Sequence, residues 1–383
     1  MSRPVAILHV VDSLETGGLE RVVADLAIAQ QAAGHRVAVF TIESTGGFRA
    51  VLEAAGVPVL VGDKRGTFDV SVLKALRRAS REVDVVHTHN FVPNYYAALA
   101  TLALKPAPVL VNTCHNMGTR LSNARLRRLY KASLARTARV AMVSRQVRDR
   151  LAETGIVAPA RATVVLNGIP IERFADAASR RPGARELLGL AADALVIGCV
   201  GRLVPVKNHA SLIAELPALS ARYPGLVVVL LGDGPLDAEL RGEAEALGVA
   251  DRVRIGAAAD VAAVLPAFDV YAQPSLSEGM SIALLEACAS GLAIVATAVG
   301  GNPDIVEDGR SGVLVPAGDG AALRNALDAL LADPTRRAAL GRAAAEWVAS
   351  NASIAFMRDA YAALYADVRA TRARATSHAR ASG

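Results

Sequence analysis

Short apolar runs alternate with amphipathic stretches along the first half of the chain. Each run is short enough to be a buried strand, and polar residues at helical spacing separate one run from the next. The pattern predicts strands at Val5–Val11, Arg36–Ile42, Val57–Val61, Val83–His87, Pro108–Thr113, Arg139–Val143 and Thr163–Leu166. It predicts intervening helices at Leu19–Gly34, Val70–Arg81, Pro93–Leu104 and Arg145–Glu153. Such alternation is typical of an α/β domain with a doubly wound parallel sheet.

This rhythm breaks between residues 168 and 192, where Pro170, Pro182 and Gly183 accompany scattered charges. Proline and glycine interrupt regular elements, so the joint between two domains is expected here. The alternation then resumes, and it predicts strands at Leu195–Val200, Leu226–Leu231, Val253–Ile255, Val270–Gln273, Ala293–Ala296 and Gly312–Val315. Helices are expected to start near Asn208, Pro235, Asp260 and Gly279. Two Rossmann-like domains are therefore predicted, covering residues 1–168 and 169–351.

The C-terminal part carries one more strong helical pattern, at Ile354–Val368. Residues 371–383 that follow are small, polar and basic. A segment of this composition has little apolar surface to bury, so it is expected to be disordered.

Composition agrees with two domains and indicates a cytoplasmic protein. The chain has 383 residues, of which 52% are hydrophobic, and this is enough for two cores of ordinary size. No apolar stretch approaches the roughly 20 residues that a membrane-spanning helix needs. The start reads as a buried strand and lacks the features of a signal peptide. The three cysteines form no disulfide framework and are expected to be reduced.

The charge is divided unevenly between the two halves. Residues 1–180 hold 24 Lys and Arg against 14 Asp and Glu, a net of +10, whereas residues 181–383 hold 18 against 22, a net of −4. Ten basic residues lie between Arg120 and Arg150, where Asp149 is the one acid, and the recurring leucines predict a basic amphipathic helix. Such a surface suits nucleic acid, an anionic membrane, or solvent alone. No nucleic-acid-binding motif accompanies it, so peripheral attachment to the inner face of the cell membrane is favoured.

Two carboxylates, Glu278 and Glu286, lie eight residues apart around an apolar run that starts after Gly279. If a helix begins near Gly279, Glu278 lies at its N-terminus and Glu286 two turns further on. Unpaired N–H groups and the helix dipole favour anions at such an N-terminus. Acceptors for sugar hydroxyls beside a backbone site for phosphate would suit a nucleotide-sugar.

The segment from Pro274 to Glu286 resembles the E-x7-E motif of retaining glycosyltransferases of the family 4 type. Further blocks of the family occur in the same order at Gly17–Glu20, Asn167–Ile169, Gly201–Asn208 and Leu231–Pro235. The resemblance implies the GT-B fold, in which two Rossmann-like domains face each other across a cleft. It also implies that the C-terminal helix, about residues 352–370, crosses back to the first domain. The first domain would bind the acceptor and the second the nucleoside-diphosphate sugar.

Two cations are the first candidates for catalysis. Arg202 follows the strand Leu195–Val200, and Lys207 lies five residues further on. Ligands bind at the carboxyl ends of strands in doubly wound sheets, and cations placed there can neutralise a diphosphate leaving group. The chain has no Asp-x-Asp pair with which to hold a divalent metal. The resemblance agrees, since Arg and Lys replace the metal in the family, so neither a metal nor a cofactor is expected.

The resemblance assigns further roles within the same reaction. Glu286 would accept hydrogen bonds from the ribose, and Glu278 would contact the transferred hexose. The backbone at Gly279, Met280 and Ser281 would reach the sugar and phosphate. The remaining candidates lie in the first domain, where they follow predicted strands: His115 as a catalytic residue at the sugar, His89 at the acceptor, and Gly17 and Gly18 at the diphosphate.

Other interpretations stay open at this point. His9 and His87 lie inside predicted strands and are expected to be core residues, and a zinc site at His89 and His115 lacks a third ligand of suitable spacing. An epimerase of similar fold would not need the Arg202, Lys207 and glutamate set. The chain is too short for a phosphorylase, and it lacks the glycine fingerprint of an NAD-dependent dehydrogenase. A non-catalytic sugar-binding protein at the membrane is the remaining alternative.

Overall fold

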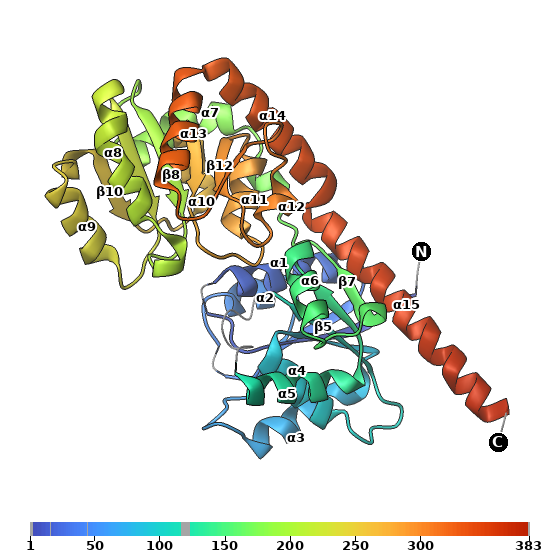
Figure 1. The fold of residues 1–383 in the computed structure, drawn as a ribbon. Coiled ribbons are helices and arrows are strands. Elements are labelled where there is room, and N and C mark those ends of the chain that lie inside the picture. The colour runs from blue at the N-terminus through green and yellow to red at the C-terminus, as the bar shows by residue number, and fades with distance from the viewer. Residues whose placement is uncertain (1–2, 16, 44, 116–122, 382–383) are drawn as a thin grey trace. The chain divides into compact units, whose positions relative to one another are not determined.

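The computed structural model describes residues 3–15, 17–43, 45–115 and 123–381, with only the backbone from residue 375 onward. The chain forms two compact units. Unit 1 comprises the chain up to Gly168 and again from Ile354, and unit 2 comprises Ile169–Ser353. Each unit is a parallel sheet with helices on its faces, so the prediction of two Rossmann-like domains is confirmed (Figure 1).

The sheet of unit 1 has the strand order β3-β2-β1-β4-β5-β6-β7. Its strands are β1 Ala6–Val11, β2 Arg36–Thr41, β3 Val59–Val61, β4 Val85–His89, β5 Val109–Cys114, β6 Thr137–Met142 and β7 Ala162–Val164. Its helices are α1 Gly18–Ala32, α2 Arg49–Ala54, α3 Val70–Ala79, α4 Phe91–Ala100, α5 Ala124–Ser133, α6 Arg145–Glu153 and α15 Ile354–Ala381. The chain winds from β1 outward to β3 and then returns to β4, which is the reversal that places ligands at the carboxyl edge of such sheets.

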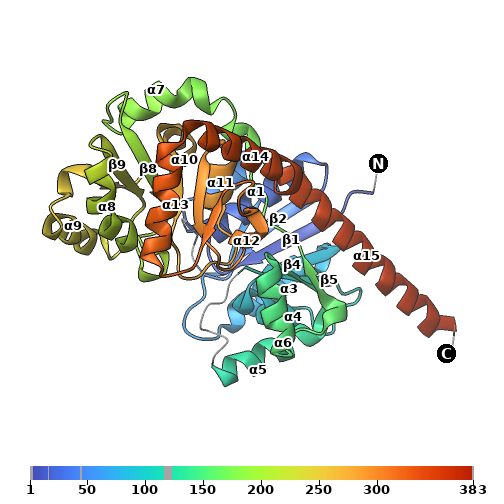
Figure 2. The same ribbon diagram turned by 45° about the horizontal axis from the view of Figure 1, so that its top comes forward.

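The two faces of this sheet pack against different helices. Leu8 and Val10 pack in an apolar cluster with residues of α3 and α4, which lie together on that face (Figure 2). Successive side chains of a strand point to opposite faces. His9 therefore points to the other face, where it bonds Gln30 of α1. The face toward α1 carries polar residues in the middle of buried strands.

Helix α15 completes unit 1 from the far end of the chain. It contacts α1, β5 and β6, so the predicted return of the C-terminal helix to the first domain is confirmed. The helix continues to Ala381 and so includes residues 371–381, for which the sequence predicted disorder. These residues are mostly Ala and Arg, which have high helix propensity, and extending an existing helix needs no new nucleus.

The sheet of unit 2 has the strand order β10-β9-β8-β11-β12-β13. Its strands are β8 Leu195–Val200, β9 Leu226–Leu231, β10 Val253–Gly256, β11 Val270–Gln273, β12 Ala293–Thr297 and β13 Val313–Val315. Its helices are α7 Ala177–Leu187, α8 Ala210–Arg222, α9 Asp237–Ala246, α10 Val261–Val264, α11 Ile282–Ala289, α12 Asn302–Ile305, α13 Gly320–Ala332 and α14 Pro334–Asn351. Every strand lies within three residues of its predicted bounds.

Helix α7 lies where the sequence pattern predicts an interrupted joint. Pro182 is inside this helix, although proline removes a backbone hydrogen bond. Tertiary contacts compensate, because Arg181 and Arg185 donate to the two oxygens of Asp269 at 2.6 and 3.1 Å. Arg185 also donates to three carbonyls of the following loop. Partners distant in sequence therefore hold a segment that local propensity disfavours.

Candidate active site

The motif residues of unit 2 lie where neighbouring strands end. Strands β9, β8 and β11 are adjacent in the sheet, and they end at Leu231, Val200 and Gln273. The loops that follow carry the segments 201–208, 232–235 and 274–281. Parallel strands deliver these loops to one edge of the sheet, so the blocks singled out in the sequence gather there.

A short ion pair joins two of the predicted catalytic residues. Lys207 closes a 3-10 turn, Pro205–Lys207, and its Nζ donates to Glu278 Oε1 at 2.7 Å. The side chains are 23% and 8% exposed, so the contact is largely shielded from water. Glu278 Oε1 also accepts from Ser275 Oγ at 2.7 Å and from Gln273 Nε2 at 3.3 Å. Four residues thus fix one carboxylate oxygen and one ammonium at the end of β11.

The start of helix α11 differs from the prediction. The helix begins at Ile282, because Ser281 Oγ caps it by accepting from the N–H of Leu284 at 3.2 Å. The same hydroxyl donates to Gln273 Oε1 at 2.8 Å and so connects the cap to the Glu278 network. Glu286 consequently lies about one turn into the helix instead of two.

The remaining donor-site candidates of unit 2 occupy different environments. Gly279 and Met280 are buried in the loop before α11, Glu286 is half-buried, and Arg202 is exposed after β8. Gly300 has a φ of +57°, and a Cβ there would lie 2.1 Å from the carbonyl oxygen of Glu278. Close backbone approach at Gly300 therefore positions the Glu278 loop, and Gly300 belongs to none of the sequence motifs named above.

The Gly232–Pro235 block serves the loop that carries Arg202. A Cβ on Gly232 would lie 2.0 Å from the carbonyl oxygen of Gly201, and one on Gly234 would lie 2.4 Å from that of Leu203. The N–H of Leu203 donates to the carbonyl of Asp233 at 2.7 Å. The two loops are therefore in direct backbone contact. The block therefore fixes the position of the neighbouring loop.

Replacing Gly232 with alanine should lower the free energy of unfolding by roughly 1–3 kcal/mol, because the new methyl group overlaps backbone atoms that cannot rotate away. Urea unfolding followed by fluorescence of Trp347, the single tryptophan of the chain, measures the change within unit 2. Gly242→Ala is the matched control: it lies inside α9, and nothing lies within 4 Å of its added Cβ. This control should be neutral or more stable by up to about 1 kcal/mol. Equal stabilities for the two variants would contradict the close approach.

In unit 1, Gly17 and Gly18 begin helix α1. Gly17 is the N-cap and has extended backbone, and Gly18 is the first helical residue. A Cβ on Gly17 would lie 2.2 Å from Glu20 Oε2, so the glycine makes room for the Glu20 side chain. Burial raises the pKa of Glu20 above its ordinary value.

The two predicted histidines of unit 1 lie against each other. His89 is the last residue of β4 and His115 follows β5, the neighbouring strand. His89 Nδ1 and His115 Nε2 are 3.0 Å apart. Both rings are buried, with 2% and 8% of each residue exposed. The adjacent segment 116–122 lies outside the described residues.

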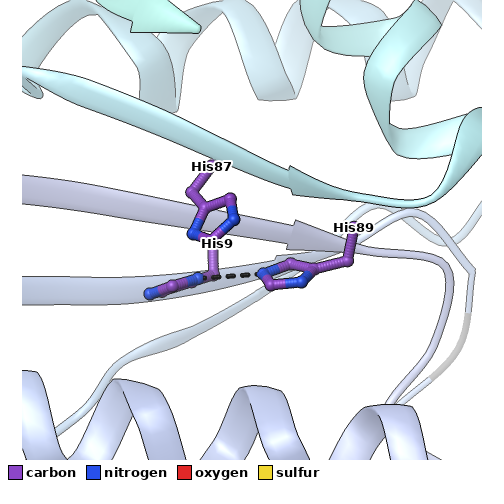
Figure 3. Close-up of side chains that lie close together, drawn as sticks. All are labelled: His9, His87 and His89. Carbon is purple, nitrogen blue, oxygen red and sulfur yellow. Dashed lines mark hydrogen bonds between the residues drawn. The ribbon is translucent and has the colours of Figure 1, made fainter. Parts of the chain in front are cut away.

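His9 and His87, expected only as core residues, lie close to His89 (Figure 3) and extend the pair of His89 and His115 into a cluster. His9 Nδ1 lies 3.1 Å from His89 Nε2, and both new rings are fully buried. The strand register pairs His9 with His87, and the two-residue period puts His87 and His89 on the same face. The alternation of side chains between the two faces of the sheet, applied to these two strands, was the sequence signal that could have revealed the cluster.

Three imidazoles this close could in principle hold a metal, since their ligand atoms lie within 4.8 Å of one another. However, His87 Nδ1 and Nε2 are each 2.7 Å from an oxygen, of Tyr365 and of Thr113 respectively. The nitrogens of His9 and His89 are engaged likewise, at 2.8 to 3.1 Å. A metal would have to displace protein partners from these rings, so we interpret the cluster as a hydrogen-bond network. Burial lowers the pKa of His9 to about 4 and that of His115 to about 3, so the network is neutral at physiological pH.

The basic segment 120–150 contains helix α5, as the amphipathic pattern predicts. Arg125, Arg128 and Lys131 are exposed on this helix together with Leu129, which is 50% exposed. Among the other basic residues of the segment, Arg136 donates to the carbonyl of Thr101, and Arg139 pairs with Asp367 at 2.9 Å. Arg120 lies outside the described residues. Among the helices of the described chain, none is both long and apolar enough to cross a membrane.

Comparison with known families identifies the chain. Residues 16–173 match the family described as Glycosyltransferase Family 4, and residues 181–347 match Glycosyl transferases group 1. The Anabaena protein HepE, solved in complex with UDP-glucose, superposes with a TM-score of 0.84 at 23% identity, over 95% of this chain and 100% of HepE. Two parallel doubly wound units of this kind define the GT-B class of glycosyltransferases.

Curated relatives identify the family within this class. A D-inositol 3-phosphate glycosyltransferase of Actinosynnema mirum is 34% identical over 366 residues, which is 85% of this chain and 86% of that enzyme. A GDP-mannose-dependent alpha-(1-6)-phosphatidylinositol monomannoside mannosyltransferase of Mycolicibacterium smegmatis is 38% identical over 224 residues, 55% of this chain and 58% of that enzyme. The chain belongs to the family 4 glycosyltransferases.

Proposed function

We propose that this glycosyltransferase moves a hexose from a nucleoside-diphosphate sugar to a lipid-linked saccharide, with retention of the anomeric configuration and without a metal. Unit 2 binds the donor and unit 1 the acceptor. The product is a glycolipid or surface polysaccharide precursor made at the cytoplasmic face of the membrane. The lipid-linked acceptor is supported by the mycobacterial relative, whose name specifies a phosphatidylinositol mannoside.

The Lys207–Glu278 ion pair is the observation that carries this proposal. A shielded ammonium held at a strand end can move its hydrogen bonds to a diphosphate, and Arg202 adds a second cation on the same loop. Both would stabilise the negative charge that develops on the leaving group. Since the sequence has no Asp-x-Asp pair, these cations take the role that a divalent metal has in other transferases.

The other residues of unit 2 complete the donor site. Glu286, half-buried in the first turn and a half of α11, accepts the ribose hydroxyls. Glu278 accepts from the hexose, and the N–H groups at Gly279, Met280 and Ser281 donate to sugar and phosphate oxygens. From unit 1, His115 contacts the hexose, His89 the acceptor side, and Gly17 and Gly18 the diphosphate.

Incubation with a panel of nucleotide-sugars in excess EDTA tests the function. Slow hydrolysis of one donor, or thermal stabilisation by it, should identify the base and the hexose. Transfer should persist in EDTA, and NMR of the product should show the anomeric configuration of the donor. Activity that returns only with added Mg²⁺ or Mn²⁺ would refute metal independence, and an inverted anomer would refute retention. Binding without any turnover would favour a non-catalytic sugar-binding protein.

Glu286→Ala should weaken binding of the bare nucleoside diphosphate by roughly 10-fold or more, because a carboxylate that receives hydroxyl hydrogen bonds is lost. Glu278→Gln should leave that affinity nearly unchanged and impair the complete nucleotide-sugar instead, since the bare diphosphate has no hexose. Calorimetric titration with both ligands separates the two roles. If the Glu286 variant bound the diphosphate as well as the parent, the ribose assignment would be wrong.

The exposed basic face of α5 should bind anionic membranes. Arg125, Arg128 and Lys131, with Arg136 after the helix, contribute roughly 1 kcal/mol each near an anionic surface. Sedimentation with liposomes should show binding that needs anionic lipid and fades as salt rises. Charge reversal at Arg125 and Arg128 should abolish it, whereas Arg241→Glu, an exposed control on α9 in unit 2, should not. Equal binding to neutral liposomes, or none at low salt, would leave this face as a solvated surface.

A further inference from the structure

Two branches of buried hydrogen bonds meet at Gln30, a residue of α1 that is 1% exposed. In the first branch, Gln30 Oε1 lies 2.8 Å from His9 Nε2, and the branch continues through His89 to His115. In the second, Gln30 Nε2 donates to the hydroxyl of Tyr365, which lies 2.7 Å from His87 Nδ1. One amide therefore joins four histidines to the C-terminal helix.

Proton counting gives the first branch a direction. The amide oxygen can only accept, so the neutral ring of His9 carries its proton on Nε2 and leaves Nδ1 bare. His89 must then donate from Nε2 to His9, which leaves its own Nδ1 bare. His115 in turn donates from Nε2 to His89 Nδ1. All three rings thus have the same tautomer, and each proton points toward Gln30.

The second branch is satisfied by the same orientation of the amide. The Tyr365 hydroxyl accepts from Gln30 and donates to His87 Nδ1. His87 donates from Nε2 to Thr113 Oγ1, which lies 2.8 Å from the Tyr361 hydroxyl. Turning the amide over would require every proton in both branches to move. The two branches are therefore coupled through this amide, and its orientation sets the position of every proton in both.

The exposed fraction increases along the first branch, from 0% at His9 to 2% at His89 and 8% at His115. His115 is thus the member nearest to solvent, and Asn90 Oδ1 fixes its backbone by accepting from its N–H at 3.0 Å. Gln30 cannot take up or release a proton at ordinary pH, so the branch ends there and does not conduct protons to another site. Its effect is on the orientation of His115.

We propose that Gln30 and His9 are positioning residues that fix, through His89, the tautomer and ring orientation of His115, so that His115 meets the substrate with Nδ1 as an acceptor and takes no part as a general acid. The consequence for turnover rests on the proposed function, in which His115 contacts the transferred hexose. The tautomer itself is a property of the unliganded protein and can be measured without substrate.

Long-range ¹H–¹⁵N correlation spectra of the full chain labelled with ¹⁵N-histidine test the tautomer directly, with signals assigned by single substitutions. In the parent protein at neutral pH, His9, His89 and His115 should each show a protonated Nε2 and a bare Nδ1. Gln30→Met removes the amide at similar side-chain length, and it should give His115 a mixture of tautomers. His9→Leu interrupts the branch at the next position and should have the same effect, which covers the case in which one variant fails to fold.

Tyr361→Phe is the matched control. Like Gln30→Met, it removes a buried hydrogen-bonding group that lies beside α15. The group lost here is the Tyr361 hydroxyl, which bonds Thr113 at the far end of the second branch. It should leave the tautomer of His115 and the turnover unchanged. Gln30→Met should lower kcat by roughly 10-fold or more with little change in KM for the donor, because the reacting groups are misaligned.

A mixture of tautomers in the parent, or a single unchanged tautomer of His115 in both Gln30→Met and His9→Leu, would overturn the proposal. A changed tautomer with unchanged kcat would remove the catalytic consequence. Failure of the proposed function can be distinguished from these outcomes. In that case the parent protein would turn over no nucleotide-sugar, whereas the tautomers measured in the unliganded protein would be as expected.

Discussion

Replacing Lys207 with methionine should lower kcat on the order of 10²-fold and change KM for the donor much less, by analogy with the loss of one oxyanion-hole donor. Methionine preserves much of the side-chain length but removes the ammonium that lies 2.7 Å from Glu278. If this charge acts mainly on the leaving diphosphate, its loss is felt in the transition state more than in the bound substrate. Steady-state kinetics with the donor found in the panel separate the two parameters.

Arg324→Met is the matched control for this variant. Arg324 donates to Glu215 at 2.7 Å in the same unit, and its partner is 15% exposed. Both substitutions break an ion pair of similar length, so thermal unfolding should register both, but only the Lys207 variant should lose turnover. A raised KM with unchanged kcat in the Lys207 variant would show that the ammonium contributes to ground-state binding alone.

Acidification below pH 6.5 should destabilise unit 1 much more steeply than unit 2. Burial lowers the pKa of all four histidines of the network, to about 4 for His9 and about 3 for His115, with His87 and His89 also well below the ordinary value of 6.5. Between pH 6.5 and these lowered pKa values, the unfolded chain binds protons at histidines that stay neutral in the folded chain. The contribution of these histidines to the free energy of unfolding is therefore complete above pH 6.5 and is lost as the pH decreases. Each such ring lowers the free energy of unfolding by up to about 1.4 kcal/mol per pH unit of acidification, and the four together lower it by up to roughly 5 kcal/mol per pH unit.

Unit 2 provides the internal control, because it contains a single histidine, His209, whose pKa burial lowers to about 4. Urea titrations between pH 7 and pH 4.5 should be followed with two probes. Trp347 fluorescence reports on unit 2, whereas five of the seven tyrosines lie in unit 1 and dominate its near-UV circular dichroism. Equal pH dependence of the two signals would mean that the histidines of unit 1 are accessible to protons in the folded state.

The sequence by itself determined most of the architecture. Strand after strand could be placed from short apolar runs, since a parallel strand covered on both faces must be apolar throughout. The loops at strand ends could also be assigned, because the chemistry of Arg202, Lys207 and Glu278 coincides with the place where doubly wound sheets bind ligands. The pairing of Lys207 with Glu278 was not predictable, although both residues were singled out.

Only the tertiary structure decided the features that depend on distant partners. Helix α7 persists across Pro182 because Asp269 holds its arginines, 84 and 88 residues away. Helix α11 begins at its serine cap, whose hydroxyl also bonds the end of β11. In unit 1, residues separated by 21, 80 and 26 positions form the branch from Gln30 to His115. Periodicity registers which face of an element is buried, but the partner a polar side chain meets there depends on strand order and register, which bring distant segments together.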